Sequence, residues 1–172
     1  MPASNMCMDN VTPHNKQAID FENIVKEYSL LITKVCYYFA TNISELKDLR
    51  QDVLLNIWTG WENFRMQSKP STWIYRVCFN TCITYQRKNR QRKNEVPLSS
   101  VLESEDDTFD MEMYREMHRL INQLGAEDKA IIMMWLDENS YEEIAEVIGL
   151  KRNTVATRIK RIKEKLVKLS NE

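Results

Sequence analysis

The chain has 172 residues with a formal net charge of −1, and 28% of its residues are charged. It contains 3 glycines and 4 prolines, too few for many tight turns between strands, so the composition favours an all-α protein. The longest apolar run, Ala130 to Leu136, is far shorter than the ~20 residues that span a bilayer, and the stretch MPASNMCMDN lacks the basic and apolar segments of a secretion signal. These features argue against membrane insertion and favour a cytoplasmic protein.

The N-terminal part of the chain contains two predicted helices. Residues 1–18 are polar and aperiodic, which is typical of a flexible tail. From Phe21, apolar residues recur at spacings of three and four, and this pattern predicts an amphipathic helix that ends near Ala40. Ser44, followed by an acid, suits the start of a second helix, which we expect to stop at Gly60.

A third helix and an acidic linker follow. A loop over residues 62–70 precedes Ser71, the predicted N-cap of a helix that runs to about Arg92. The stretch over residues 96–110 has no apolar periodicity and is rich in acids, which indicates a linker.

The C-terminal part is again helical. The sequences MEMYREMHRLINQL and EDKAIIMMWLDE predict helices on either side of Gly125. The predicted fold is therefore all-α, with two small helical domains, residues 19–94 and 111–172, joined by an acidic linker over residues 95–110.

The sequence SYEEIAEVIGLKRNTVATRIKRIKEKL has the ground plan of a helix-turn-helix. Ser140 and Glu143 suit a capping box, and Gly149 suits a left-handed helix end. In the second helix, the apolar stripe that we expect to be buried comprises Val155, Ile159, Ile162, Leu166 and Leu169. Beside it, a polar and cationic face suited to the major groove contains Arg152, Asn153, Thr154, Thr157, Arg158, Arg161 and Lys165.

Charge is divided into blocks along the chain. Residues 65–94 contain 8 Lys or Arg and no acid, and residues 149–172 contain 8 Lys or Arg against 2 acids. Between them, residues 95–148 contain 15 acids against 3 Lys or Arg. Because exposed charges are screened beyond about 8 Å at physiological salt, a phosphate responds to the nearest block, and the near-zero total does not exclude nucleic-acid binding.

The first basic block is interleaved with aromatic residues. Exposed rings can stack on unpaired bases while cations follow the backbone of a single strand. Phe64 and Trp73 are the rings we expect to be exposed, and Phe79 is the ring we expect in the core. The cations of this block include Arg65, Lys69, Arg76, Arg87 and Lys88. A solvated helix face is the competing interpretation of any single run of charges.

The second predicted helix exposes a mildly acidic face that is unsuited to DNA. This face consists of Asp48, Gln51, Asp52 and Asn56. It is either a solvated surface or a contact for a protein partner, and the pattern alone leaves both open.

The sequence contains no glycine-rich phosphate loop and no HExxH motif, so we expect a protein that is not an enzyme and needs no cofactor. Cys78 and Cys82 would share a helix face, but His14 and His118 stand at no ligand spacing from them. We therefore expect these cysteines to be buried small apolar side chains rather than metal ligands.

Three stretches resemble one family, the bacterial sigma factors, and specifically their extracytoplasmic-function group. DLRQDVLLNIW resembles the region-two helix that grips the polymerase clamp, and STWIYRVCFNTCITYQRKNR resembles the next helix, including an asparagine at Asn80. The sequence from LGAEDKAIIM to KRIKEKL is similar to region four. The resemblance covers residues 21–169 in the right order.

This resemblance implies a factor that binds core RNA polymerase, recognises promoter DNA and promotes its melting. It implies that Arg152 to Arg161 read the minus-thirty-five element. It also implies that an unpaired minus-ten base is captured by the loop from Phe64 to Ser71 together with Trp73, Arg76 and Asn80. The polymerase clamp would be contacted by Asp48, Gln51, Asp52 and Asn56. An anti-sigma factor is a further implied partner.

Two other interpretations are compatible with the residues alone. A plain DNA-binding regulator would use residues 20–92 for sensing or dimerisation and would bind duplex DNA without polymerase. An interaction module held by another protein is a third possibility, which is also compatible with a sigma factor.

Overall fold

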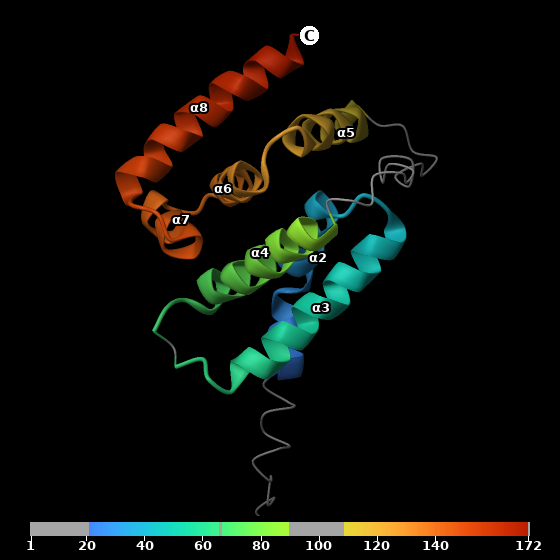
Figure 1. Cartoon of the computed structure of the whole chain (residues 1–172), viewed down its shortest axis with the longest axis vertical. Coiled ribbons are helices and arrows are strands. Elements are labelled where there is room, and N and C mark those ends of the chain that lie inside the picture. The colour runs from blue at the N-terminus through green and yellow to red at the C-terminus, as the bar shows by residue number, and fades with distance from the viewer. Residues whose placement is uncertain (1–20, 66, 90–108, 172) are drawn as a thin grey trace, which may run out of the picture.

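The structure is a computed structural model that describes residues 21–65, 67–89 and 109–171. The predicted tail, most of the predicted acidic linker and the predicted end of the third helix at Arg92 lie outside these ranges. Within them the regular elements are helices, which confirms the all-α prediction (Figure 1). None of the described helices has the length and hydropathy needed to cross a membrane.

The N-terminal module consists of α2 (Ser29–Phe39), α3 (Ile43–Trp61) and α4 (Pro70–Asn89), preceded by a helical stretch over residues 21–27. A turn at Tyr28 interrupts what the sequence predicted as one continuous helix.

The helix boundaries of this module correct three predictions. Asn42, not Ser44, caps α3, because its side chain accepts a hydrogen bond from the Glu45 amide at 2.8 Å. Gly60 does not end α3, which continues to Trp61. Ser71 lies inside α4, which begins at Pro70 because a proline at the first helical position needs no N–H partner.

The C-terminal module consists of α5 (Phe109–Asn122), α6 (Ala126–Leu136), α7 (Tyr141–Ile148) and α8 (Arg152–Ser170). The capping box of Ser140 and Glu143 is present, and Gly149 has the left-handed φ of 77° that ends α7. Both confirm predictions from the sequence. α5 begins at Phe109, so the last two residues of the predicted linker are helical.

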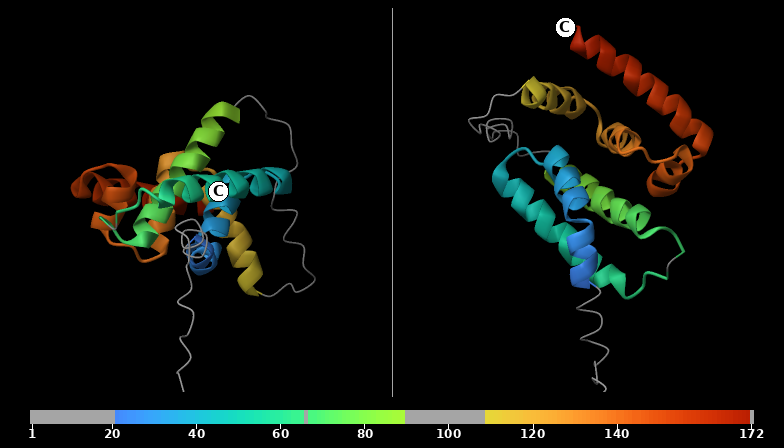
Figure 2. Two further views of the ribbon diagram at one scale, coloured as in Figure 1. Left: turned by 90° about the horizontal axis from the view of Figure 1, so that it is seen from below. Right: turned by 180° about the vertical axis from the view of Figure 1, so that it is seen from behind.

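The two modules pack directly against each other. α4 lies between α2 and α3 on one side and α6 and α7 on the other, as the views in Figures 1 and 2 agree. Buried side chains of both modules, including Phe39, Phe79, Met134 and Ile144, belong to one continuous apolar cluster. The two modules therefore share a core, an arrangement that the sequence left open.

Polar groups are buried at the same interface. The Lys129 ammonium on α6 donates to the Tyr38 carbonyl of α2 at 2.8 Å and to Asn122 Oδ1 at 2.7 Å. Burial lowers the pKa of Lys129 to about 8. The His118 ring lies 4.5 Å from the Tyr37 ring and 5.1 Å from the Tyr38 ring, and burial lowers the pKa of its imidazole. These contacts tie α5 and α6 to the end of α2.

Candidate nucleic-acid and polymerase interfaces

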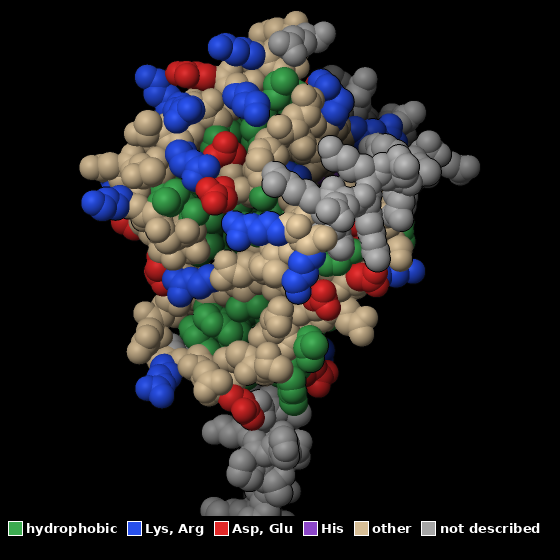
Figure 3. Space-filling view, viewed as in Figure 1, with side chains coloured by type: hydrophobic (Ala, Val, Ile, Leu, Met, Phe, Trp, Pro, Cys, Tyr) green, Lys and Arg blue, Asp and Glu red, His purple; other side chains and the backbone are tan. Residues whose placement is uncertain are grey.

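The helix-turn-helix is formed by α7, the turn at Gly149 and α8. Val155, Ile159 and Ile162 are buried against α6 and α7, as the apolar stripe predicted, whereas Leu166 and Leu169 at the end of the stripe are only half-buried. The opposite face of α8 is exposed and carries most of the predicted groove-facing side chains: Arg152, Asn153, Thr154, Thr157, Arg161 and Lys165. Basic side chains gather over this helix in Figure 3. Near the start of α8, Arg152 pairs with Glu142 and lies over the Tyr141 ring at 5.6 Å.

Arg158 differs from the other predicted groove-facing residues, because it turns toward the start of α6. Its Nη1 is 2.9 Å from Glu127 Oε2 and its Nη2 is 2.7 Å from Asp128 Oδ1. The side chain keeps 27% of its exposure. The guanidinium is therefore occupied by two carboxylates, and any contact with DNA would have to compete with them.

The two rings predicted to be exposed pack on each other instead of standing free. The Phe64 and Trp73 ring centroids are 5.0 Å apart, and Trp61 lies 5.4 Å from Phe64 and 5.8 Å from Trp73. Phe64 and Trp73 are each half-buried, so the two rings expected to be exposed are exposed only in part, whereas Phe79 is buried as expected. The three rings form a cluster, here called the aromatic cluster, beside the loop that joins α3 and α4. Apolar side chains reach the surface there in Figure 3.

Gly60 is a member of this site that sequence reasoning missed. A Cβ at Gly60 would lie 2.9 Å from Trp73 Cζ2, closer than such contacts normally allow. The glycine was interpreted as a helix stop, but the structure uses its missing side chain to let the indole lie on α3. The contact joins residues on different helices, so local pattern could not reveal it.

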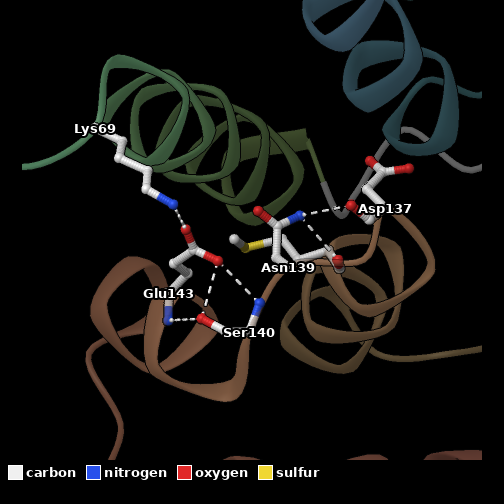
Figure 4. Close-up of polar contacts among 6 residues, drawn as sticks. Lys69, Asp137, Asn139, Ser140 and Glu143 are labelled. Carbon is white, nitrogen blue, oxygen red and sulfur yellow. Dashed lines mark hydrogen bonds and ion pairs between the residues drawn. The ribbon is translucent and has the colours of Figure 1, made fainter.

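The predicted cations of the first basic block fall into two groups. Arg65, Arg87 and Lys88 are exposed, as is Asn80. Lys69 and Arg76 contact α7, although 73% of the Lys69 side chain stays exposed. Lys69 Nζ is 2.6 Å from Glu143 Oε1, and Arg76 Nη2 is 2.9 Å from the Glu146 carbonyl and 3.3 Å from Glu146 Oε1. Figure 4 shows Lys69 reaching from the start of α4 to Glu143, whose other oxygen holds Ser140.

Glu143 is strongly held in its ionised form. The hydrogen bond from Lys69 is the main cause, followed by bonds from Ser140, and together they lower the pKa of Glu143 to about 2. The Lys69 pKa is raised by the same bond. The sequence predicted the capping function of Glu143 but not its partner Lys69, the residue just before α4.

The predicted partner-binding face of α3 is exposed as a whole. Asp48, Gln51, Asp52 and Asn56 all lie at the surface, and Asn56 Nδ2 donates to Thr81 Oγ1 on α4 at 2.9 Å. The structure adds Leu55, which is 58% exposed. At 100° per residue it lies in the middle of this face, so the spacing alone could have identified it.

A surface groove runs beside this face, between α3 and α4. Its volume is about 380 Å³, and its lining includes Asp52, Leu55 and Asn56 from α3 and Asn80 and Lys88 from α4. The candidate protein-binding face and part of the candidate strand-binding surface therefore adjoin each other.

The described cysteines lie in the core of the N-terminal module. Cys36, Cys78 and Cys82 are buried and free, as the sequence predicted for the last two, and burial raises the pKa of the Cys78 thiol. Among the described residues, no group of three or more His, Cys, Asp or Glu is placed to hold a metal ion. Cys7 and His14 lie outside the described ranges.

Comparison with known proteins matches both modules to one family. Residues 24–92 match the model of sigma-70 region 2, and residues 114–166 match that of sigma-70, region 4. The chain is similar to the ECF RNA polymerase sigma factor SigW of Bacillus subtilis (strain 168), with 27% identity over 164 residues, 86% of this chain and 87% of that protein.

Two solved structures have a similar fold. One is the sigma factor RpoE in complex with the anti-sigma factor NepR from Bartonella quintana, with a TM-score of 0.72 and 20% identity over 88% of this chain and 97% of that chain. The other is CnrH in complex with the cytosolic domain of CnrY, with a TM-score of 0.65 and 18% identity over 88% of this chain and 87% of that chain.

Proposed function

The chain belongs to the extracytoplasmic-function group of sigma-70 factors, and we propose that three of its surfaces divide the work of starting transcription. As a sigma factor it binds core RNA polymerase and recognises promoter DNA. The proposal assigns the exposed face of α8 to the duplex, α4 with the aromatic cluster to the melted strand, and the acidic face of α3 to the polymerase.

The exposed face of α8 is proposed to hold the minus-thirty-five element. Arg152, Asn153 and Thr154 stand in the first turn, where free backbone N–H groups and the helix dipole favour a phosphate. Thr157, Arg161 and Lys165 continue the same face and reach base edges or the backbone farther along the groove.

The aromatic cluster and the exposed groups of α4 are proposed to hold the unpaired minus-ten strand. Partly exposed rings offer stacking surfaces to extruded bases, and Arg65, Arg87 and Lys88 can follow the phosphates. Asn80 lies on the same helix and can hydrogen-bond to a base. The packing of three rings fixes the orientation of Trp73 before any DNA arrives.

Replacing Gly60 with alanine tests this orientation. The new Cβ would push the Trp73 indole away from α3, so promoter opening should fall severalfold while duplex binding stays unchanged. Thermal stability should change by less than about 1 kcal/mol, because the helix-propensity gain of Gly→Ala is of that size and opposes the clash. The comparison is with Gly125→Ala, whose Cβ would meet no atom within 4 Å. Equal opening by the two variants would contradict the proposed orientation.

The observation that carries the functional assignment is the face of α3. A helix that exposes Leu55 amid Asp48, Gln51, Asp52 and Asn56 is poorly suited to DNA and well suited to a protein. A plain DNA-binding regulator has no use for such a face beside its strand-binding surface. Core RNA polymerase is the partner that accounts for a protein-binding face next to a strand-binding surface.

Leu55→Asp is the test of this assignment. If Leu55 is a central anchor, its loss should weaken binding to core polymerase by about 30-fold or more, the size expected of an interface hot spot. Leu30→Asp is the matched control, because Leu30 is 84% exposed on α2 and lies outside this face. Binding is measured by titrating labelled protein with core polymerase. Equal losses in the two variants, or no polymerase binding by the unaltered protein, would remove the assignment.

One of the two solved structures reported above is of the sigma factor RpoE in complex with the anti-sigma factor NepR, and we extend this kind of partnership to the present protein. An anti-sigma factor is therefore a proposed partner besides polymerase and promoter DNA. The protein is further proposed to be cytoplasmic and to act without catalytic activity of its own.

A further inference from the structure

A surface cavity lies where the two modules meet. Its volume is about 790 Å³, which is within the ~300–1,000 Å³ typical of sites that hold small molecules. One side is formed by the end of α2, the start of α3 and the end of α4, and the other by the end of α5 and the start of α6. Its apolar lining includes Phe39, Ile83 and Tyr85 from the N-terminal module and Leu124 from the C-terminal module. A ligand with an apolar body would therefore find contacts with both modules there.

The wall of this cavity contains a buried cation. Lys129 is 5% exposed, and its ammonium donates to two neutral acceptors, the Tyr38 carbonyl at 2.8 Å and Asn122 Oδ1 at 2.7 Å. Phe39, whose ring centroid is 5.2 Å from Nζ, and Asn122 both line the cavity, which places the ammonium at its wall. Within the described part of the chain no carboxylate pairs with it, and burial lowers the pKa of Lys129. Because an ammonium has three N–H donors, one remains for a ligand.

The acids that line the cavity are already engaged by other donors. Glu127 and Asp128 pair with Arg158 at 2.9 Å and 2.7 Å. Glu45 accepts hydrogen bonds from the Thr41 amide at 2.8 Å and the Thr41 hydroxyl at 2.7 Å. The buried charge of the lining that lacks a counterion is therefore positive, and a bound anion would supply the missing opposite charge.

We propose that this cavity binds a small carboxylic acid with an apolar body. The carboxylate accepts the third N–H of Lys129, and the body packs between the apolar side chains of α4 and Leu124 of the C-terminal module. A carboxylate suits the site better than a phosphate, because the three acids of the lining would repel a dianion more strongly than a monoanion. This inference does not depend on which surfaces bind DNA or polymerase.

The test titrates the full chain with 1-naphthoate and with 1-naphthamide by isothermal titration calorimetry. The two probes have the same ring system and nearly the same size, but only the first is charged. The unaltered protein should bind 1-naphthoate about tenfold or more tightly than 1-naphthamide, because a hydrogen bond between two charged groups is stronger than one to a neutral acceptor. Equal affinity for the two probes would overturn the proposal.

The variant Lys129→Met assigns the preference to the buried ammonium. Methionine keeps an unbranched apolar side chain there and removes the charge, so the preference for 1-naphthoate should disappear. Lys163→Met is the matched control, because Lys163 Nζ lies 3.5 Å from the Trp135 ring centroid and the residue does not line the cavity. This control should keep the preference. A preference that persists in Lys129→Met would contradict the proposed site.

A second variant keeps the test decisive if Lys129→Met does not fold. Ile83 is half-buried on α4 and lines the cavity, so Ile83→Trp adds bulk to the wall without touching the ammonium. It should weaken the binding of 1-naphthoate and 1-naphthamide alike, because both bodies occupy the same space. Unchanged binding of both probes by Ile83→Trp would place them elsewhere on the protein and would overturn the proposal.

Discussion

Replacing Trp73 with alanine should leave binding to the upstream duplex element unchanged and reduce the formation of open promoter complexes between about fivefold and about 150-fold. This range corresponds to ~1–3 kcal/mol for one base stacked on an aromatic ring. Trp73 should have a large effect because it packs against both other rings of the aromatic cluster, with the Phe64 centroid at 5.0 Å and the Trp61 centroid at 5.8 Å. It is also the ring whose position Gly60 controls.

The same substitution removes packing, so stability has to be measured beside opening. Replacing a large aromatic side chain in a core with alanine lowers the free energy of unfolding by ~3–5 kcal/mol. The loss at half-buried Trp73 should be smaller. Trp73→Phe restores a ring that can stack and should recover most of the opening activity. The measurement is permanganate reactivity of unpaired thymines with reconstituted polymerase. Equal loss of duplex binding and opening would show that the variant damages the whole protein rather than strand capture.

Arg158→Ala should weaken binding to the upstream duplex element by ~1–3 kcal/mol, about fivefold to 150-fold, if the guanidinium reaches a base in the complex. The structure shows what this contact must displace, because Arg158 is bonded to Glu127 and Asp128. These acids keep 52% and 33% of their side-chain exposure, so the ion pairs are partly solvated and exchangeable. Affinity is measured by duplex titration at fixed salt.

Removing the two acids distinguishes direct contact between Arg158 and DNA from a role of Arg158 in holding α8 against α6. The double variant Glu127→Gln with Asp128→Asn releases Arg158 without changing it. If Arg158 contacts DNA directly, this variant should bind the duplex at least as tightly as the unaltered protein. If it instead reproduces the loss seen in Arg158→Ala, then Arg158 acts by holding α8 against α6.

Features that depend on neighbours within one or two turns could be predicted from the sequence. The capping box at Ser140, the left-handed turn at Gly149 and the buried stripe of α8 follow from short-range geometry. The predicted start of α3 at Ser44 was nevertheless wrong. Asn42 and Ser44 are both good capping residues, and the backbone conformation determines that Asn42 is the cap.

The candidate binding surfaces on α3 and in the first basic block were predictable only in part, because helical spacing shows which residues share a face but not what covers that face. The exposed face of α3 follows from helical spacing, which also placed Leu55 in its middle although the sequence reasoning overlooked it. The aromatic residues of the basic block were recognised, but their mutual packing was not. Burial depends on which element covers a face, and periodicity does not contain that information.

By itself the sequence determined the helices, the faces that each must bury and the division of charge into blocks. The tertiary structure decided which of those charges meet. Lys69 is paired with a residue 74 positions away and Arg158 with one 31 positions away, and the spacing of residues along a helix predicts neither partner. Such pairs form only when apolar faces from different helices are buried together and bring the charged rims of those faces within hydrogen-bond distance. For that reason the cationic surface of α4 is continuous in the sequence and partly occupied by α7 in the folded protein.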